Sequence, residues 1–128
     1  MDMLVLIGRM LFAAIFIGSG VRHITRPAAM SGHVAARGVP AANLMVRLTG
    51  AAVLIGGISV LLGAYARIGA AFLVIFLIPT AVVMHNFWTL SDPVAKANEQ
   101  AHFFKDLALA GAALLISYFG PGPFSLVQ

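Results

Sequence analysis

The chain has 128 residues, of which 61% are hydrophobic and only 9% are charged. A soluble domain carries roughly 25% charged residues, so this composition excludes an ordinary soluble protein and predicts an integral membrane protein with little mass outside the bilayer. The absence of cysteine excludes disulfides and thiolate metal sites. The net charge of +4 is small, and the sequence lacks the basic face with aromatic residues that nucleic-acid binding requires.

Four apolar stretches approach the roughly 20 residues that a helix needs to cross a bilayer. We expect spans at about residues 3–21, 40–62, 68–84 and 101–119 of a single domain that covers residues 1–128. The stretch from Pro27 to Arg37 is too polar to span, and Pro27 suits a first helical turn. The predicted fold is therefore all-α, an integral membrane four-helix bundle with a short interfacial helix between spans one and two.

Arg9 and Pro79 are among the residues inside the expected spans that depart from the apolar pattern. Arg9 lies near the start of the first span, where its long stem would let the guanidinium reach the interface. Pro79 lies in the second half of the third span, where it leaves the carbonyl of Ile75 without its helical donor and is expected to kink the helix.

Four spans put both termini on one side of the bilayer and both longer connections on the other. The terminal side carries Arg9 and Arg67, whereas the connection side carries Arg22, Arg26, Arg37, Arg47, Lys96 and Lys105. Because cytoplasmic loops carry an excess of Lys and Arg, this bias predicts cytoplasmic connections and both termini outside.

The polar segment 85–106 holds three of the four acidic residues, two of the four histidines and the only tryptophan. Alternation of the spans brings several ionisable residues to this same membrane face. They are His23, Arg47, His85, Glu99, His102, Lys105 and Asp106. Each alone could simply anchor a span end, but ionisable groups inside spans usually face the bundle interior, so the set predicts a polar pocket at this end.

Two pairings are expected within this pocket. His102 and Asp106 are four residues apart on one helix face, so the carboxylate could orient the imidazole, or the two could form a helix-start pair without a ligand. Arg47 and Asp106 each lie one to two turns inside a span on the same side. Because an unpaired charge at that depth costs on the order of 2.5–3.5 kcal/mol, we expect a direct or water-bridged pair. A tightly bound metal or haem is not expected.

Six short blocks run in order along the chain: residues 16–20 (FIGSG), 37–40 (RGVP), 56–67, 85–88 (HNFW), 102–106 (HFFKD) and 120–126 (GPGPFSL). In their order and spacing they resemble the DoxX family of small four-span bacterial membrane proteins, over nearly the whole chain. Two positions depart from the family pattern. Val53 stands about where many members carry a glutamate, and His23 stands where a lysine is common.

The resemblance implies a bacterial inner-membrane location and a link to oxidoreductase assemblies that handle sulfur compounds or oxidative stress, including a thiosulfate:quinone oxidoreductase. We therefore expect an integral membrane subunit of a quinone-linked oxidoreductase system. No motif for a tightly bound redox cofactor is present, so electrons would come from a partner protein. Two alternatives stay open, as does catalytic activity of the chain itself: a membrane scaffold that anchors partner enzymes without chemistry of its own, and a small transporter of a weak acid or sulfur compound. The expected partners are the lipid bilayer and either a partner protein or further copies of the chain.

For a quinone, the expected catalytic residues are His85, His102 and Asp106, because imidazoles can donate hydrogen bonds and exchange protons near neutral pH. Phe87, Trp88, Phe103 and Phe104 could flank a ring by stacking, and the Pro79 kink could open a slot between spans three and four. Lys105 would favour an anionic form of the reduced ring. The expected cofactor-binding residues are His23, Arg47, Trp88, Phe103 and Lys105.

Overall fold

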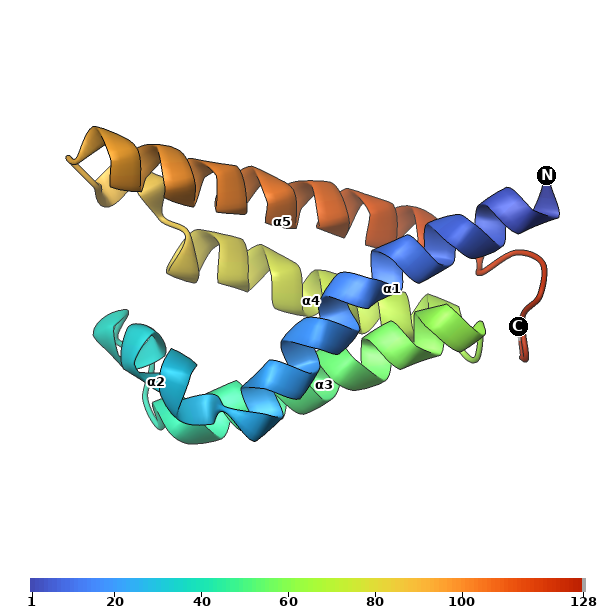
Figure 1. Ribbon diagram of the computed structural model, residues 1–128, viewed down its shortest axis with the longest axis horizontal. Helices are drawn as coiled ribbons and strands as arrows, with labels where there is room; N and C mark the ends of the chain where they lie inside the picture. The colour runs from blue at the N-terminus through green and yellow to red at the C-terminus, as the bar shows by residue number, and fades with distance from the viewer. Residues whose placement is uncertain (128) are drawn as a thin grey trace.

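A computed structural model describes residues 1–127 of the protein. Within these residues the helices follow one another as α1 (Asp2–Thr25), α2 (Pro27–Ala36), α3 (Ala42–Leu62), α4 (Ala66–Met84), the short 3-10 turn η1 (Phe87–Thr89) and α5 (Pro93–Phe119) (Figure 1). Helices α1, α3, α4 and α5 are long and apolar enough to cross a membrane. The predicted all-α membrane bundle, with a short helix between its first two spans, is confirmed.

The fourth long helix begins well before its predicted start near residue 101. Asp92 accepts a hydrogen bond at Oδ2 from the backbone N–H of Ala95 (2.9 Å), and Pro93 occupies the first helical position. Both features favour a helix start. The polar segment 85–106 is therefore irregular only around η1, and its second half presents its side chains from a rigid helix.

Both chain termini lie at one end of the bundle, and α2 and the α4–α5 connection lie at the other (Figure 1). We call these the terminal end and the connection end. This arrangement agrees with the predicted alternation of the spans. It follows from short links, because only residues 63–65 separate α3 from α4 and the two helices must run antiparallel.

The helices associate as two pairs, α1 with α3 and α4 with α5, and contacts between α3 and α4 join the pairs. Close approach within the first pair depends on glycine. A Cβ added at Gly20 would lie 2.7 Å from the Cβ of Leu54, and one added at Gly50 would collide with the side chain of His23. The fully buried side chains that bind the pairs together include Val53, Val60, Leu73 and Leu77.

At the terminal end, Arg9 is buried, with 4% of the residue exposed. Its guanidinium donates hydrogen bonds to five oxygens at 2.9–3.2 Å: the carbonyls of Leu61, Pro121, Pro123 and Phe124 and the hydroxyl of Ser125. The expectation that Arg9 reaches the interface is wrong. The tail after Gly120 folds back and offers backbone carbonyls that have no helical partner, and a guanidinium is the side chain best able to satisfy several acceptors at once.

Candidate functional site

A cavity of about 560 Å³ lies at the connection end, between the two helix pairs. We call it the polar cavity, because an unusual share of the chain's ionisable groups lines it: Arg22, His23, His33, Arg37, His85, Glu99, His102, Lys105 and Asp106. His23, His85 and His102, which we predicted to lie at one membrane face, all line this cavity. The short helix α2 contributes Met30, His33 and Val34 to its wall.

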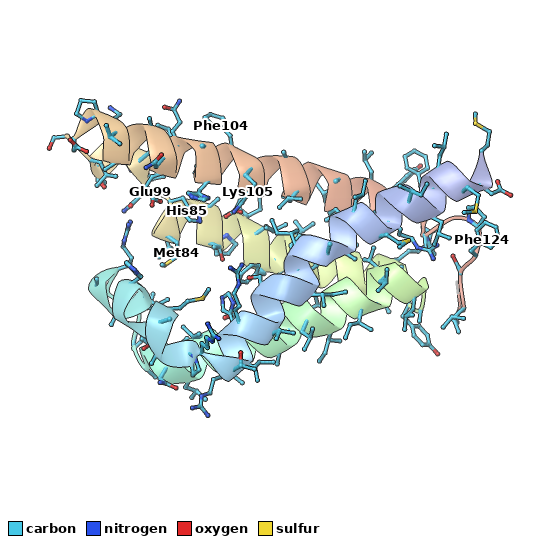
Figure 2. All side chains as sticks on the ribbon, in the orientation of Figure 1. Met84, His85, Glu99, Phe104, Lys105 and Phe124 are labelled. Carbon is cyan, nitrogen blue, oxygen red and sulfur yellow. The ribbon has the colours of Figure 1, made fainter. Side chains whose placement is uncertain are left out.

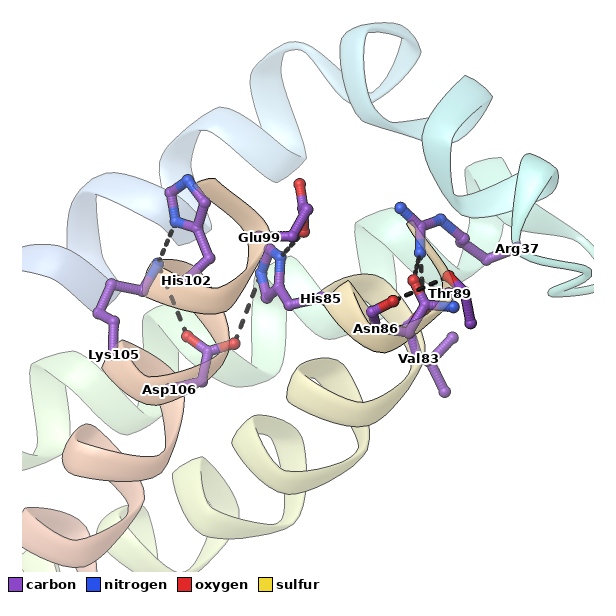
Figure 3. Close-up of polar contacts among 9 residues, drawn as sticks. All are labelled: Arg37, Val83, His85, Asn86, Thr89, Glu99, His102, Lys105 and Asp106. Carbon is purple, nitrogen blue, oxygen red and sulfur yellow. Dashed lines mark hydrogen bonds and ion pairs between the residues drawn. The ribbon is translucent and has the colours of Figure 1, made fainter. Parts of the chain in front are cut away.

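His85 lies where the polar contacts of the cavity meet (Figure 3). Its Nδ1 is 2.7 Å from Oε2 of Glu99, and its Nε2 is 3.6 Å from Oδ2 of Asp106. His85 caps the C-terminus of α4, which turns its ring toward α5. Glu99 and Asp106 are two helical turns apart on α5 and so share the face that this ring meets. The imidazole therefore lies between two carboxylates.

Asp106 is the most deeply buried member of the cluster, with 5% of the residue exposed. Its Oδ1 lies 3.6 Å from Nζ of Lys105, while its buried Oδ2 has no hydrogen-bond partner among the described residues. Nearly all buried polar atoms in folded proteins have a partner, and leaving one without costs free energy. An unpaired carboxylate oxygen on a cavity wall is therefore free to contact a molecule inside the cavity.

His102 contacts its neighbours through ring stacking and one polar contact. Its ring stacks on that of His85, with centroids 5.1 Å apart and an interplanar angle of 25°, and its Nδ1 lies 3.4 Å from Nζ of Lys105. The predicted orientation of His102 by Asp106 is wrong, because the carboxylate contacts His85 and Lys105 instead. A residue from α4, far from Asp106 in sequence, takes the position that helix periodicity assigned to His102.

Arg47 lies outside the cluster. Its side chain is exposed on α3, and it forms no ion pair with Asp106 among the described residues. The predicted pair is wrong. The buried face of α3 runs through Val46, Gly50 and Val53, which leaves Arg47 on the outward face, where its stem can carry the guanidinium toward lipid headgroups.

The aromatic residues of the connection end pack on one another, outside the cavity wall. The ring centroids of Phe87, Trp88 and Phe103 lie 5.4–5.5 Å apart, and Phe104 lies 5.3 Å from Phe103. Figure 2 shows Phe104 on the opposite side of α5 from His85 and Lys105. Trp88 and Phe103 thus hold η1 against α5, and the structure does not bring them to the cavity as the predicted ring-flanking residues.

The hydrogen bond of His23 to the backbone determines which of its two ring nitrogens carries the proton. Its Nδ1 lies 2.7 Å from the backbone carbonyl of Ser19. Because a carbonyl can only accept, Nδ1 carries the proton, and in a neutral ring Nε2 is left as an acceptor. The ring of Phe76 meets that of His23 edge to face at 6.5 Å, which fixes its orientation from the α4 side of the cavity.

Arg37 and Asn86 were not among the site residues expected from the sequence. Arg37 donates a hydrogen bond through Nη1 to Oδ1 of Asn86 and a longer one, 3.4 Å, to the carbonyl of Val83 (Figure 3). This contact ties the end of α2 to the end of α4 across the cavity. The two residues belong to the RGVP and HNFW blocks that resemble the family pattern. The sequence therefore marked both positions, but it did not indicate that they contact each other.

The cavity combines proton-exchanging groups with an apolar lining. Val46, Phe76, Val83 and Met84 supply apolar surface, and four histidines and two carboxylates supply groups that exchange protons. Among residues 1–127, no group of three or more His, Asp or Glu side chains is placed to hold a metal ion. The chemistry that this arrangement can perform by itself is recognition of a small, partly polar molecule and transfer of protons to or from it.

Comparison with known proteins identifies relatives along the whole chain. The sequence model of the DoxX family matches residues 4–86. Inner membrane protein YqjF of Escherichia coli is 31% identical over 125 residues, which covers 98% of this chain and 90% of the relative. Inner membrane protein YphA of the same organism is 28% identical over 123 residues, covering 96% and 87%. No solved structure matches the chain significantly.

The four apolar helices and the inner-membrane location of these relatives support the same conclusion. The chain is a multi-pass protein of the bacterial inner membrane. The match of the family model begins in α1 and ends at Asn86, so it includes His23, Arg37 and His85, while the relatives extend the similarity through the α5 half of the cavity. With most of its length matched, and with the helical bundle that the resemblance implied, the chain belongs to the DoxX family.

Proposed function

We propose that the protein is an integral membrane subunit of a quinone-linked oxidoreductase system and that the polar cavity receives the quinone ring. The observation that carries this proposal is the composition of the cavity wall. It joins apolar side chains to histidines and carboxylates at the end of the bundle where the membrane meets water. A lipid-soluble ring with two carbonyl oxygens needs both kinds of surface.

The dimensions and polarity of the cavity fit such a ring. Small-molecule sites typically enclose about 300–1,000 Å³, are mostly apolar and hold a few convergent polar groups. The cavity encloses about 560 Å³ and has His23 and His85 on opposite helix pairs. Nζ of Lys105 could donate a hydrogen bond to a carbonyl oxygen of the oxidised ring, and Nε2 of His23, an acceptor in the neutral imidazole, could accept one from a hydroxyl of the reduced ring. The apolar side chains of Phe76 and Val83 would cover its faces.

A bound quinone would supply the two-electron chemistry, and the chain would handle protons and charge. His85 and His102 exchange protons near neutral pH. Lys105 places a positive charge between His102 and Asp106, which favours negative charge developing on a nearby oxygen. The electrons come from a partner protein that docks at the membrane surface, since the chain's own residues offer no redox centre.

We also propose that the connection end faces the cytoplasm. Six of the eight Lys and Arg residues lie toward this end, and the positive-inside rule assigns that end to the cytoplasm. The cavity then opens on the side where cytoplasmic redox enzymes could deliver electrons. Labelling a single cysteine introduced at exposed Ala36 with an impermeant maleimide in right-side-out vesicles tests this, and labelling without permeabilisation would reverse the orientation.

Quinone binding can be measured directly on the detergent-purified protein. Trp88 is the only tryptophan and packs against Phe103 of α5, so quenching of its fluorescence by a short-chain quinone reports binding near the cavity. We expect saturable quenching in the wild type and at least about tenfold weaker binding in His85→Ala and His102→Ala, because each loses a polar contact of about 1.4 kcal/mol or more.

The matched control is Lys96→Gln, which removes a charge from an exposed position of the same helix and should bind like the wild type. Quenching that rises linearly in every variant would mean partition into detergent without a site. That result would reject the quinone proposal and favour a scaffold that anchors partner enzymes. The transport alternative has less support, because the buried side chains of Phe16, Val53 and Leu73 lie between the cavity and the Arg9 cluster.

A further inference from the structure

We propose that Glu99, His85 and Asp106 form a proton relay from the water at the connection end to the inner wall of the polar cavity. The inference rests on the proposed function, because reduction of a bound quinone consumes the protons that the relay delivers. It deepens that function by assigning the path of the proton to three named side chains.

The three groups lie in one line of decreasing exposure (Figure 3). Their side chains are 27% exposed for Glu99, 21% for His85 and 6% for Asp106. Glu99 can exchange protons with water, whereas Asp106 is shielded by the surrounding helices. The two ring nitrogens of His85 face the two carboxylates separately, at 2.7 Å and 3.6 Å. An imidazole with one acceptor or donor on each nitrogen can pass a proton through its ring.

The transfer balances in protons and moves no electrons. A proton taken from water by Glu99 passes from its carboxyl oxygen to Nδ1 of His85, and the proton on Nε2 leaves for Oδ2 of Asp106. The ring is neutral before and after and changes tautomer, Glu99 returns to a carboxylate, and Asp106 becomes a carboxylic acid. Asp106 then donates its proton to an oxygen in the cavity. A half-turn of the imidazole ring returns a bare nitrogen to the Glu99 side.

Oδ2 of Asp106 has the properties that an endpoint of the relay requires. It is buried, lines the cavity with its residue and has no hydrogen-bond partner among the described residues. The 3.6 Å between Nε2 and Oδ2 exceeds a hydrogen bond by a few tenths of an ångström. Catalytic hydrogen bonds are often long before a ligand is bound and shorten in the complex.

Cationic and titratable side chains face the relay from α5, α1 and the α2 segment, whereas α3 lines the cavity with Met45, Val46 and Thr49. Lys105 and His102 contact it from α5, and across the cavity lie Arg22 and His23 of α1 and His33 and Arg37 of α2. The relay is thus flanked by the cationic side chains of Lys105, Arg22 and Arg37, and Asp106 carries the proton from His85 to the cavity.

Infrared spectroscopy of the full chain in lipid nanodiscs tests the relay. The carboxylic acid stretch of Asp106 is assigned by its loss in Asp106→Asn, and its exchange from H to D is followed after rapid mixing with deuterated buffer. We expect exchange about 100-fold slower in Glu99→Gln, because a positioned proton-transfer group contributes about that factor or more. His85→Phe should slow exchange similarly, and Lys96→Gln, on the exposed face of α5, should match the wild type.

Equal exchange rates in the wild type and Glu99→Gln would overturn the relay, because water would then reach Asp106 directly. An Asp106-dependent band that is missing at every pH where the protein stays folded would overturn it as well. Quinone titration of the same preparations separates the two proposals. Quinone binding without Glu99-dependent exchange rejects only the relay. Glu99-dependent exchange without quinone binding keeps the proton path and rejects the quinone.

Discussion

The two ends of the bundle differ in what surrounds their buried ionisable side chain. At the terminal end, neutral oxygens accept five hydrogen bonds from the two Nη groups of Arg9, and only its Nε is left without a partner among the described residues. At the connection end, Asp106 is equally buried, yet one of its oxygens has no partner and faces a cavity. The first arrangement fastens the C-terminal tail to the bundle. The second leaves a hydrogen-bonding atom available to a ligand. Functional sites commonly keep such unpaired groups although they lower the stability of the fold.

The largest effect is expected from Arg9→Met. It removes the only donor group shared by the five oxygens of the tail and α3, and stranded buried acceptors together with the lost contacts should cost about 3–5 kcal/mol. Unfolding in denaturing detergent would measure this loss, with Arg26→Met at an exposed position as the control. If both variants unfold alike, Arg9 does not fasten the tail and the contrast between the ends disappears.

A smaller loss is expected from Gly50→Ala, which tests how tightly the connection end is packed. The new Cβ would collide with the side chain of His23, and overpacking of this kind costs about 1–3 kcal/mol. Gly18→Ala is the matched control on α1, because nothing lies within 4 Å of its added Cβ. The same unfolding assay applies. A wild-type stability for Gly50→Ala would mean that α1 and α3 can separate freely at the cavity.

Asp106→Asn should leave the free energy of unfolding within about 1 kcal/mol of the wild type, while it abolishes proton exchange at this position. The change removes a buried charge without stranding another, because Lys105 is 42% exposed and can reach water. Asp2→Asn, at the exposed N-terminus, is the control. A loss of stability as large as that of Arg9→Met would show that the cluster is structural and would weaken the proposed site.

The smallest effect on stability, about 0.5–1 kcal/mol, is expected from Arg37→Gln, which removes the contacts between α2 and α4. Access to the cavity should change more. The chain has no cysteine, so Met30→Cys on the cavity wall can be labelled selectively with a maleimide. We expect faster labelling when Arg37→Gln is added and unchanged labelling with Arg26→Gln. Equal rates in all three would mean that Arg37 does not hold α2 across the cavity.

The site itself was predictable in its position and only partly in its contacts. His23, His85 and His102 were expected in one layer because alternation of spans is a topological consequence of their number. The contacts of Asp106 were expected from positions on its own helix and from depth in the membrane. The first argument predicted His102 as the partner and the second predicted Arg47, and both were wrong. Neither the periodicity of one helix nor the depth of a residue in the membrane says how far a helix is rotated about its axis relative to its neighbour.

The sequence by itself determined the membrane location, the four spans, the interfacial helix and the end of the bundle at which polar residues gather. These properties depend on the length and hydrophobicity of continuous segments, which the chain states directly. Only the tertiary structure decided that Arg9 fastens the tail, that Arg47 faces outward and that His85 lies between Glu99 and Asp106. Those contacts join segments far apart in the chain, and they depend on how small residues such as Gly20 and Gly50 let the helices approach.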